Sequence, residues 1–309
     1  MTANPRVRVT EFGLQAHSTS SLEGLVLIDT HTHFYDPTRP QGVPWPSPKE
    51  KALYRPVLPE HYKALAIPEG VTGTVVVEAS PWVEDNQWIL DLAAKEPFIL
   101  GYVGNLRLGA EDFRANLERF AANPLFRGLR ASGAAIRELV HTGQLDDLET
   151  LAAKDLELDL LLGPADLPAV YELAQRIPSL RLVLDHVAGV RIDGRAPDSA
   201  WVEGIRQVAT CPNVFCKVSG LAEQTGQRPA PTNLDYYLPT LEVLWNAFGE
   251  ERLIYGSNWP VCEPFASYAT VQRLVGEYFG RKGAEASEKY FWKNAQTAYA
   301  LHRGDAARR

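Results

Sequence analysis

The stretch Leu25-Val26-Leu27-Ile28-Asp29-Thr30-His31-Thr32-His33 is an apolar run that ends in two histidines separated by one residue. Side chains alternate across a β-strand, so His31 and His33 point to the same side of the strand that this run predicts. Two imidazoles aimed together can hold a metal ion, polarise a substrate oxygen or share a proton with a reacting group. The same spacing also occurs by chance or in a simple hydrogen-bonded pair, so the two histidines alone do not establish a functional site.

Seven further short, β-branched runs follow at fairly regular intervals, and each leads into a helical pattern or a polar loop. Eight strands that alternate with helices predict an α/β fold, a single-domain (β/α)8 barrel of the TIM type. An open doubly wound sheet is the alternative, but no run is followed by the GxGxxG or GxxxxGK loop that would hold a nucleotide phosphate. We expect the strands at Leu25–His31, Gly73–Ala79, Ile99–Asn105, Phe126–Ala131, Leu156–Leu162, Arg181–Val187, Asn213–Ser219 and Arg252–Asn258. We expect helices at Asn86–Lys95, Glu111–Ala122, Leu145–Ala153, Leu167–Arg176, Ala200–Ala209 and Tyr236–Phe248.

The predicted barrel spans residues 25–303, between an N-terminal tail, 1–24, and a short C-terminal tail, 304–309. The N-terminal tail is polar and lacks the charged-then-apolar order of a secretory signal. The chain has 3 cysteines and no CxxC pair, so the sequence predicts neither a disulfide framework nor a thiolate zinc site. We therefore expect a cytoplasmic protein.

The overall composition narrows the class of partner. Hydrophobic residues make up 45% of the chain and charged residues 22%, and no apolar stretch is long enough to cross a bilayer. The formal net charge of -7 argues against a protein that binds the nucleic-acid backbone, although a local basic pocket for a small carboxylate is compatible with it. We expect a small-molecule substrate, no nucleic acid and no membrane. A homodimer is compatible with the sequence.

Polar residues close most of the predicted strands. In a barrel of this type the catalytic side chains come from the carboxyl ends of the strands, so these residues are the candidates. Burying each of them without a partner would cost about 1 to 3 kcal/mol, so their convergence on one functional rim is the simpler explanation. The candidates are His31, His33, Glu78, Arg130, Asp185, His186, Lys217, Ser219, Ser257, Asn258 and Trp259.

Six motifs occur along the chain in the order of one known family. They are Ile28-Asp29-Thr30-His31-Thr32-His33, Val75-Val76-Val77-Glu78-Ala79-Ser80, Phe126-Arg127-Gly128-Leu129-Arg130, Leu182-Val183-Leu184-Asp185-His186, Lys217-Val218-Ser219-Gly220-Leu221 and Tyr255-Gly256-Ser257-Asn258-Trp259-Pro260-Val261. Together with Phe291-Trp292-Lys293-Asn294-Ala295, which is similar to the last helix of the family, they resemble the amidohydrolase-2 family. The branch of sugar-acid lactonases and pyrone-dicarboxylate lactonases is the most similar. The resemblance implies a barrel that hydrolyses or decarboxylates small acidic or polyhydroxylated substrates.

One position departs from this resemblance. The family usually has Gly-Ser-Asp-Trp-Pro on the eighth strand, and the resemblance would make that aspartate the general base for the attacking water. Here the residue is Asn258, whose amide cannot accept a proton near neutral pH and can only orient water or substrate. Another residue is then the base, or the chemistry differs. The carboxylates to consider are Glu78, Asp185 and Glu263, and the imidazoles are His31, His33 and His186.

The same departure bears on metal binding. Metal-dependent members of the superfamily usually add a histidine on the fifth strand and the aspartate on the eighth, where this chain has 160–162, all leucine, and Asn258. A two-metal centre is therefore not expected. His31, His33 and His186 could still hold a single divalent metal such as zinc, which would lower the pKa of bound water to about 7. The loss of two usual ligands favours a reaction that requires no metal.

For a lactonase without a required metal, the rim suggests distinct roles. We expect His31, His33 and His186 to polarise the lactone carbonyl and hold the developing oxyanion. Asn258 would position the water, and Glu78 is a further catalytic candidate. Glu78 could instead be a buried hydrogen-bond acceptor that orients its neighbours.

Four residues, of which only Trp82 lies outside the rim list, are candidates for substrate binding. Arg130 and Lys217 would anchor carboxylate or hydroxyl groups, or else pair with buried carboxylates. Trp82 and Trp259 would form aromatic walls for a sugar ring, or else pack in the core.

Three functions compete at this point. The first is hydrolysis of a lactone of a sugar acid or dicarboxylic acid by water attack on the ring carbonyl. The second is metal-dependent decarboxylation of an aromatic or unsaturated acid. The third, prompted by Asn258 alone, is non-catalytic binding of small acids. Fold analogy cannot separate them, because one barrel supports many chemistries.

Overall fold

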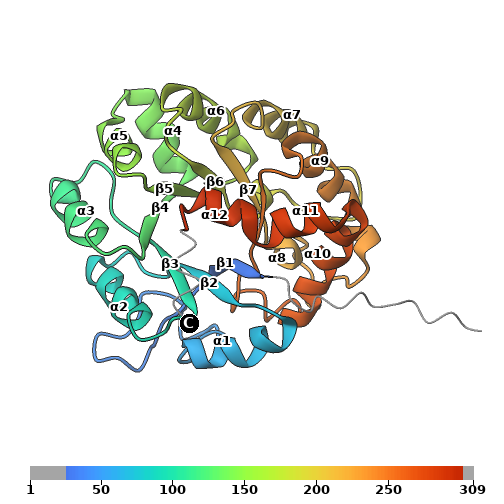
Figure 1. The fold of residues 1–309 in the computed structure, drawn as a ribbon, viewed down its shortest axis with the longest axis horizontal. Helices are drawn as coiled ribbons and strands as arrows, with labels where there is room; N and C mark the ends of the chain where they lie inside the picture. The colour runs from blue at the N-terminus through green and yellow to red at the C-terminus, as the bar shows by residue number, and fades with distance from the viewer. Residues whose placement is uncertain (1–25, 302–309) are drawn as a thin grey trace, which may run out of the picture.

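The computed structural model describes residues 26–301, which form an eight-stranded parallel sheet in the order β1 to β8. Hydrogen bonds from the amide of His33 to the carbonyl of Trp259 and from the amide of Asn258 to the carbonyl of His31, each 2.9 Å, join the first strand to the segment after the last. The predicted (β/α)8 barrel is confirmed (Figure 1). The predicted tails, 1–24 and 304–309, lie outside the described residues. The strands are β1 Ile28–Thr32, β2 Gly73–Val77, β3 Ile99–Gly104, β4 Phe126–Ser132, β5 Glu157–Leu161, β6 Leu182–Leu184, β7 Val214–Val218 and β8 Leu253–Tyr255.

Helices surround the strands on the outside of the barrel (Figure 1). Each of the six predicted helices is present within a few residues of its expected bounds. The α-helices are α1 Pro59–Ala66, α2 Val83–Ala93, α3 Phe113–Ala121, α4 Gly133–Thr142, α5 Asp146–Ala153, α6 Leu167–Arg176, α7 Ser199–Val208, α8 Leu221–Gln224, α9 Leu238–Phe248, α10 Tyr268–Lys282, α11 Ala284–Glu288 and α12 Asn294–Ala298. Short 3-10 turns lie at Ile67–Glu69, Pro164–Asp166 and Leu234–Tyr236, a left-handed turn lies at His186–Gly189, and a π-helical turn lies at Lys289–Lys293.

Helix α7 shows why these segments are helical. The side chain of Asp198 caps its first turn by accepting hydrogen bonds from the amides of Ala200 and Trp201. Its buried residues recur three and four positions apart, which gives one apolar face toward the strands. These residues are Trp201, Gly204, Ile205 and Val208.

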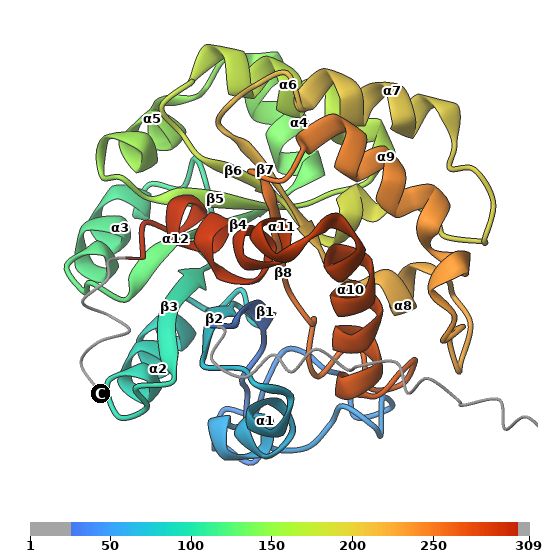
Figure 2. The same cartoon turned by 45° about the vertical axis from the view of Figure 1, so that its right-hand side comes forward.

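The strands are buried on both faces, which explains their continuous apolar runs. In β2 every residue from Gly73 to Val77 is buried. Val76 packs outward in the core between sheet and helices, and Val75 and Val77 belong to a separate cluster inside the barrel. This inner cluster also includes Ala298 and Tyr299 at the C-terminus. Figure 2 shows α12 lying across one end of the barrel, so the site lies toward the other end.

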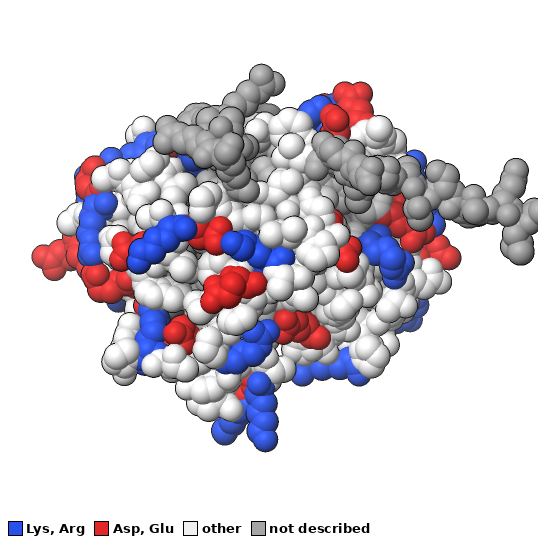
Figure 3. Space-filling view, turned by 60° about the horizontal axis from the view of Figure 1, so that its bottom comes forward, with Lys and Arg blue, Asp and Glu red and all other residues white. Residues whose placement is uncertain are grey.

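The surface carries charges of both signs. Figure 3 shows acidic and basic side chains interspersed over the face it presents, without a continuous basic stripe. Within residues 26–301, no helix combines the length and the apolar character needed to cross a membrane.

Candidate active site

Strand β1 delivers His31 and His33 to the carboxyl end of the barrel. The carboxylate of Asp29, buried below them, accepts hydrogen bonds from the amide of His31 at 3.1 Å and from the amide of Ser257 at 2.8 Å. This contact ties β1 to the segment after β8 and fixes the backbone that carries both histidines. The imidazole centroids of His31 and His33 lie 5.0 Å apart, and that of His186 lies 4.3 Å from that of His31. The structure thus brings the three predicted imidazoles together.

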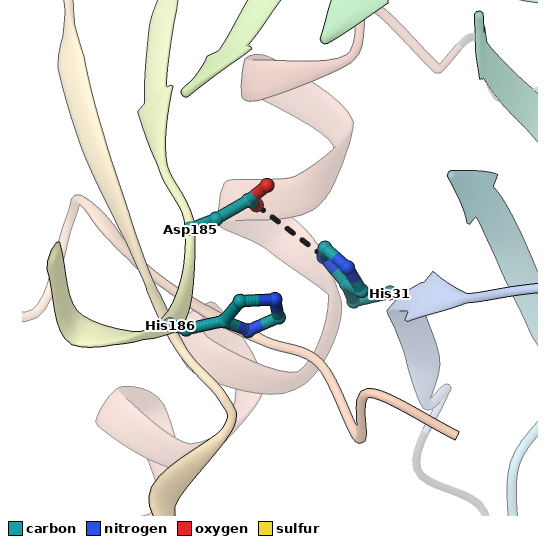
Figure 4. A group of neighbouring side chains, drawn as sticks. All are labelled: His31, Asp185 and His186. Atoms are coloured by element: carbon teal, nitrogen blue, oxygen red, sulfur yellow. Dashed lines mark ion pairs between the residues drawn. The ribbon is translucent and has the colours of Figure 1, made fainter. Parts of the chain in front are cut away.

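His186 sits on an unusual backbone turn at the end of β6. His186, Val187 and Ala188 all have a positive φ, of 50°, 51° and 55°, which non-glycine residues rarely adopt and which costs about 1 to 3 kcal/mol for each. The indole of Trp201 donates to the carbonyl of Val187 at 3.1 Å and helps to hold this turn. Gly220 packs against it so closely that a Cβ there would lie 2.9 Å from the Cβ of His186. The turn aims the His186 ring at His31 (Figure 4).

A buried lysine links the imidazoles to two carboxylates. The ammonium of Lys217 lies 3.0 Å from Oδ1 of Asp185 and 3.1 Å from Nδ1 of His31, and it also contacts Oδ2 of Asp159. None of these four side chains is exposed. The phenol of Tyr299 completes the group by donating to Oδ1 of Asp159 at 2.9 Å. We call these five residues the Lys217 network.

Burial and charge set the protonation states in this network. Burial alone would raise the pKa of Asp185, but the charge of Lys217 holds the pKa of this carboxyl well below its usual range. Burial would lower the pKa of Lys217, but Asp159 and Asp185 raise it. Burial, together with the charge of Asp185, raises the pKa of Asp159 to about 6. Lys217 is therefore a cation and Asp185 an anion at neutral pH.

The three histidines are neutral at neutral pH. Burial, followed by the charge of Lys217, lowers the pKa of His31 well below its usual value. Burial lowers the pKa of His33 to about 3, with a further contribution from Arg130, and the pKa of His186 to about 4. These rings can therefore donate or accept one hydrogen bond at each nitrogen, but they do not carry positive charge.

Hydrogen-bond partners assign the proton on two of the rings. Nδ1 of His33 lies 2.9 Å from the carbonyl of Val77, which can only accept, so Nδ1 carries the proton and Nε2 is an acceptor. Nδ1 of His31 faces the ammonium of Lys217 at 3.1 Å, which is nearer than Asp185 at 3.3 Å. Because an ammonium can only donate, the proton of His31 lies on Nε2. This Nε2 is buried and has no hydrogen-bond partner among the described residues.

Glu78 and Arg130 form a buried pair at the ends of β2 and β4. The guanidinium donates to Oε1 of Glu78 at 2.8 Å and to its backbone carbonyl at 2.9 Å. Glu78 is 8% exposed, so it acts in this structure as the acceptor that orients Arg130. The positive charge of Arg130 also lowers the pKa of His33, which places this cation near the imidazoles.

Asn258 follows β8 and adopts a φ of 60°, a left-handed conformation that asparagine tolerates better than most residues. Its amide Nδ2 donates to Oε1 of Glu223 at 2.8 Å. Burial raises the pKa of Glu223 to about 7. Glu223 therefore lies beside the residue that replaces the usual aspartate.

The two tryptophans differ in position. Trp82 precedes α2 and is 39% exposed, so it is not a core residue. Trp259 is 0% exposed, with its ring packed against Phe34 and Tyr62 and its indole donating to Glu263 at 2.8 Å. The expected wall at Trp259 is therefore a core contact instead. Lys217 is also fully buried, so its contacts in this structure are with the protein rather than at a substrate surface.

Sequence reasoning missed two acidic residues of the site. Asp159 alternates with leucines on β5, and the signal was two acidic residues, Glu157 and Asp159, at strand spacing among leucines. Glu223 lies in the short helix α8, and no local pattern distinguishes it from a surface glutamate. Only the packing of α8 against the segment after β8 brings it to Asn258.

The described residues contain one group with the spacing of metal ligands. Ligand atoms of His31, Asp185 and His186 all lie within 4.8 Å of one another (Figure 4). These two imidazoles and one carboxylate are ligand types that suit a single divalent ion, but the Nε2 of His31 would first have to lose the proton assigned to it above. His33, which the sequence included as a ligand, is not part of this group. The Lys217 ammonium, 3.0 Å from Asp185, would compete with such an ion for the same carboxylate.

A parallel barrel with imidazoles, carboxylates and a buried lysine at the carboxyl ends of its strands has the form of a barrel enzyme. The chain belongs to the amidohydrolase family, whose model matches residues 28–301. It is 35% identical over 264 residues to L-fucono-1,5-lactonase of Burkholderia ambifaria, covering 83% of this chain and 84% of that protein.

Two solved structures of an amidohydrolase from Burkholderia multivorans have a similar fold. One, with bound HEPES, superposes with a TM-score of 0.81 at 26% identity. The other, with bound zinc, gives a TM-score of 0.79 at 27% identity. Each comparison covers 90% of this chain and 100% of the other.

Proposed function

We propose that this protein is a lactonase that opens a 1,5-lactone of a small sugar acid by attack of water on the ring carbonyl. The name of the Burkholderia ambifaria relative, L-fucono-1,5-lactonase, supports this substrate class. The observation that carries the chemistry is the unpartnered Nε2 of His31, a buried donor beside two other neutral imidazoles. The decarboxylase and the non-catalytic binder have no comparable support.

In the proposed reaction the carbonyl oxygen of the lactone accepts a hydrogen bond from Nε2 of His31. This donor strengthens its bond as negative charge develops on that oxygen in the tetrahedral intermediate. The Lys217 ammonium behind the ring fixes the tautomer, since it donates to Nδ1 at 3.1 Å. His186 packs beside His31 and is proposed as the second contact with the reacting group.

Other residues position the reactants. We assign Arg130, oriented by Glu78, to a hydroxyl or carboxylate remote from the reacting carbon. The partly exposed indole of Trp82 would stack on the lactone ring of the substrate, and Asn258 would orient the attacking water. Nε2 of His33 is an acceptor, so we assign it to a substrate hydroxyl rather than to the oxyanion.

A divalent metal is compatible with this site but is not required by the proposal. If one binds, His31, Asp185 and His186 would hold it, and it would polarise the carbonyl and lower the pKa of bound water. A cytoplasmic location and a homodimer stay predictions.

The test measures proton release with a pH indicator when the purified protein meets a panel of aldonic-acid and dicarboxylate lactones. Each lactone is run with and without a strong chelator. We expect opening of one stereochemical class of sugar-acid 1,5-lactone, with a rate that the chelator changes by less than about threefold. No turnover above buffer, with or without added zinc, would refute the proposed function.

A further inference from the structure

Glu223 is a carboxylate at the rim that the resemblance does not assign. It follows β7 on helix α8 and reaches across to the segment after β8, where its Oε1 accepts a hydrogen bond from Nδ2 of Asn258 at 2.8 Å. Its second oxygen, Oε2, is buried and has no hydrogen-bond partner among residues 26–301. A buried carboxylate oxygen without a partner costs about 1 to 3 kcal/mol or more, which is typical of a group whose partner is a ligand or a reacting water.

We propose that Glu223 is the general base of this enzyme and replaces the aspartate that Asn258 has displaced. The inference rests on the proposed lactonase function. The geometry that supports this inference is the hydrogen bond between Asn258 and Glu223. The Asn258 amide, at the usual position of the base, donates to a carboxylate that follows the neighbouring strand. The backbone of Asn258 is in turn bonded to that of His31, since its amide donates to the carbonyl of His31 at 2.9 Å. Asn258 therefore connects Glu223, the proposed base, with His31, the proposed hydrogen-bond donor to the oxyanion.

The environment suits a base that works at neutral pH. Burial raises the pKa of Glu223 to about 7, where a carboxylate takes a proton from water more readily than an exposed glutamate does. An open groove of about 460 Å³ reaches this residue from outside, lined also by Gln224, Gln227 and Tyr236. The groove borders Glu223 on its outer side, while its Oε2 stays buried on the side of Asn258.

Few neighbouring groups titrate in the same range. Burial raises the pKa of the Cys262 thiol well above its usual value and that of the Tyr237 phenol to about 12, so both stay neutral near pH 7. Across the groove, hydrogen bonds from Arg195, with a smaller contribution from Arg191, lower the pKa of Asp193. The pKa of Asp159 in the Lys217 network is also raised, to about 6, so an ionisation near pH 7 is assigned to Glu223 only where Glu223→Gln removes it.

The proposed step balances in protons and electrons. Glu223 takes one proton of the attacking water while the water oxygen forms its bond to the lactone carbonyl carbon. The tetrahedral intermediate collapses, the bond between the carbonyl carbon and the ring oxygen breaks, and that oxygen leaves with the electron pair. Glu223 returns its proton to the leaving alkoxide. The hydroxy acid then ionises and releases the one proton that the indicator records.

The test compares wild type with Glu223→Gln and Glu223→Asp on the lactone that wild type opens. The surface change Glu242→Gln, which removes a carboxylate paired with Lys282 on the outer helices, is the control. We expect Glu223→Gln to lower kcat at least 100-fold, to change KM less than about threefold, and to lose the rise of kcat/KM through about pH 7. Glu223→Asp should keep that rise with a smaller loss of rate. Circular dichroism and calorimetric binding of the ring-opened acid check that each variant is folded.

The outcomes separate the inference from the function on which it rests. Activity of Glu223→Gln within about threefold of wild type, or a pH profile that keeps its rise near 7, overturns the inference and leaves the lactonase intact. If Glu223→Gln and Glu223→Asp lose kcat equally and the pH profile of kcat/KM is unchanged, the role of Glu223 is structural. This result also overturns the inference. If Glu223→Gln fails to fold, a wild-type profile without an ionisation between pH 6 and 8 overturns it. Inactivity of wild type on every lactone refutes the proposed function, and the inference falls with it.

Discussion

Replacing Lys217 by methionine tests the electrostatic account of the barrel interior. The ammonium lies 3.0 Å from Asp185 and 3.1 Å from His31, contacts Asp159, and is fully buried. Methionine keeps the apolar part of the side chain, so the change removes the charge more than the packing. Asp159 and Asp185 are then left facing each other without a cation.

The structure sets the size of the effect. Breaking a buried ion pair by removing one partner costs about 3 to 5 kcal/mol, and here two carboxylates lose the same cation. For a barrel of this size the loss corresponds to a fall in Tm of roughly 5 to 8 °C. The exposed-side change Lys282→Met, which breaks a pair with Glu242, should cost at most about 1 kcal/mol.

The pH dependence gives this prediction its sign. In wild type the lowered pKa of Asp185 stabilises the fold above the unfolded value of 3.8, and this stabilisation is lost as pH falls through the folded pKa. In Lys217→Met the buried carboxyls have raised pKa values, so the folded state is penalised more as pH rises above 4. The stability difference between wild type and variant should therefore be larger at pH 8 than at pH 5.

Urea titrations followed by tryptophan fluorescence and by far-UV circular dichroism measure these differences, with coincident curves as the check on two-state behaviour. A loss below about 1 kcal/mol at pH 8, or a loss that does not shrink at pH 5, would refute the buried-charge reasoning.

Three further substitutions probe the site at other points. His186→Ala should lower kcat for lactone opening by about 100-fold with an unchanged thermal melt, and an unchanged kcat would remove it from the mechanism. Tyr299→Phe removes the hydrogen bond to Asp159 and should lower the free energy of unfolding by about 1.5 to 3 kcal/mol in urea, whereas no change would mean that this contact is dispensable. Glu78→Gln weakens the acceptor that orients Arg130 and should raise KM about tenfold with a smaller change in kcat, a split that steady-state kinetics would contradict if kcat fell instead.

The strands could be predicted because burial on both faces makes each of them a continuous apolar run. Helix α4 was less visible because it begins directly at the end of β4, where Ser132 is both the last strand residue and the N-cap. Helix α10 does carry an apolar period, because Tyr268, Val271, Val275 and Tyr278 are buried and lie three and four positions apart, so its absence from the predicted helices is an oversight. Local periodicity fails where an element shares its boundary with another, as β4 and α4 do.

The site divides in the same way. The rim could be predicted from topology alone, because parallel strands in a barrel all end on one side. The contact partners of the rim residues could not be predicted in this way. Lys217 turns into the barrel toward Asp159 instead of toward a substrate, and Trp259 packs in the core. The contact between Glu223 and Asn258 also joins residues 35 positions apart through the placement of a four-residue helix. Side-chain direction and long-range packing decide such pairs.

The closure of the barrel by its last helix also links the two ends of the described chain through the barrel interior. The phenol of Tyr299, just after α12, donates to Asp159, and Asp159 pairs with the Lys217 ammonium that contacts His31 on the first strand. Helix α12 is therefore both a plug at one end of the barrel and a source of a polar group behind the imidazoles at the other.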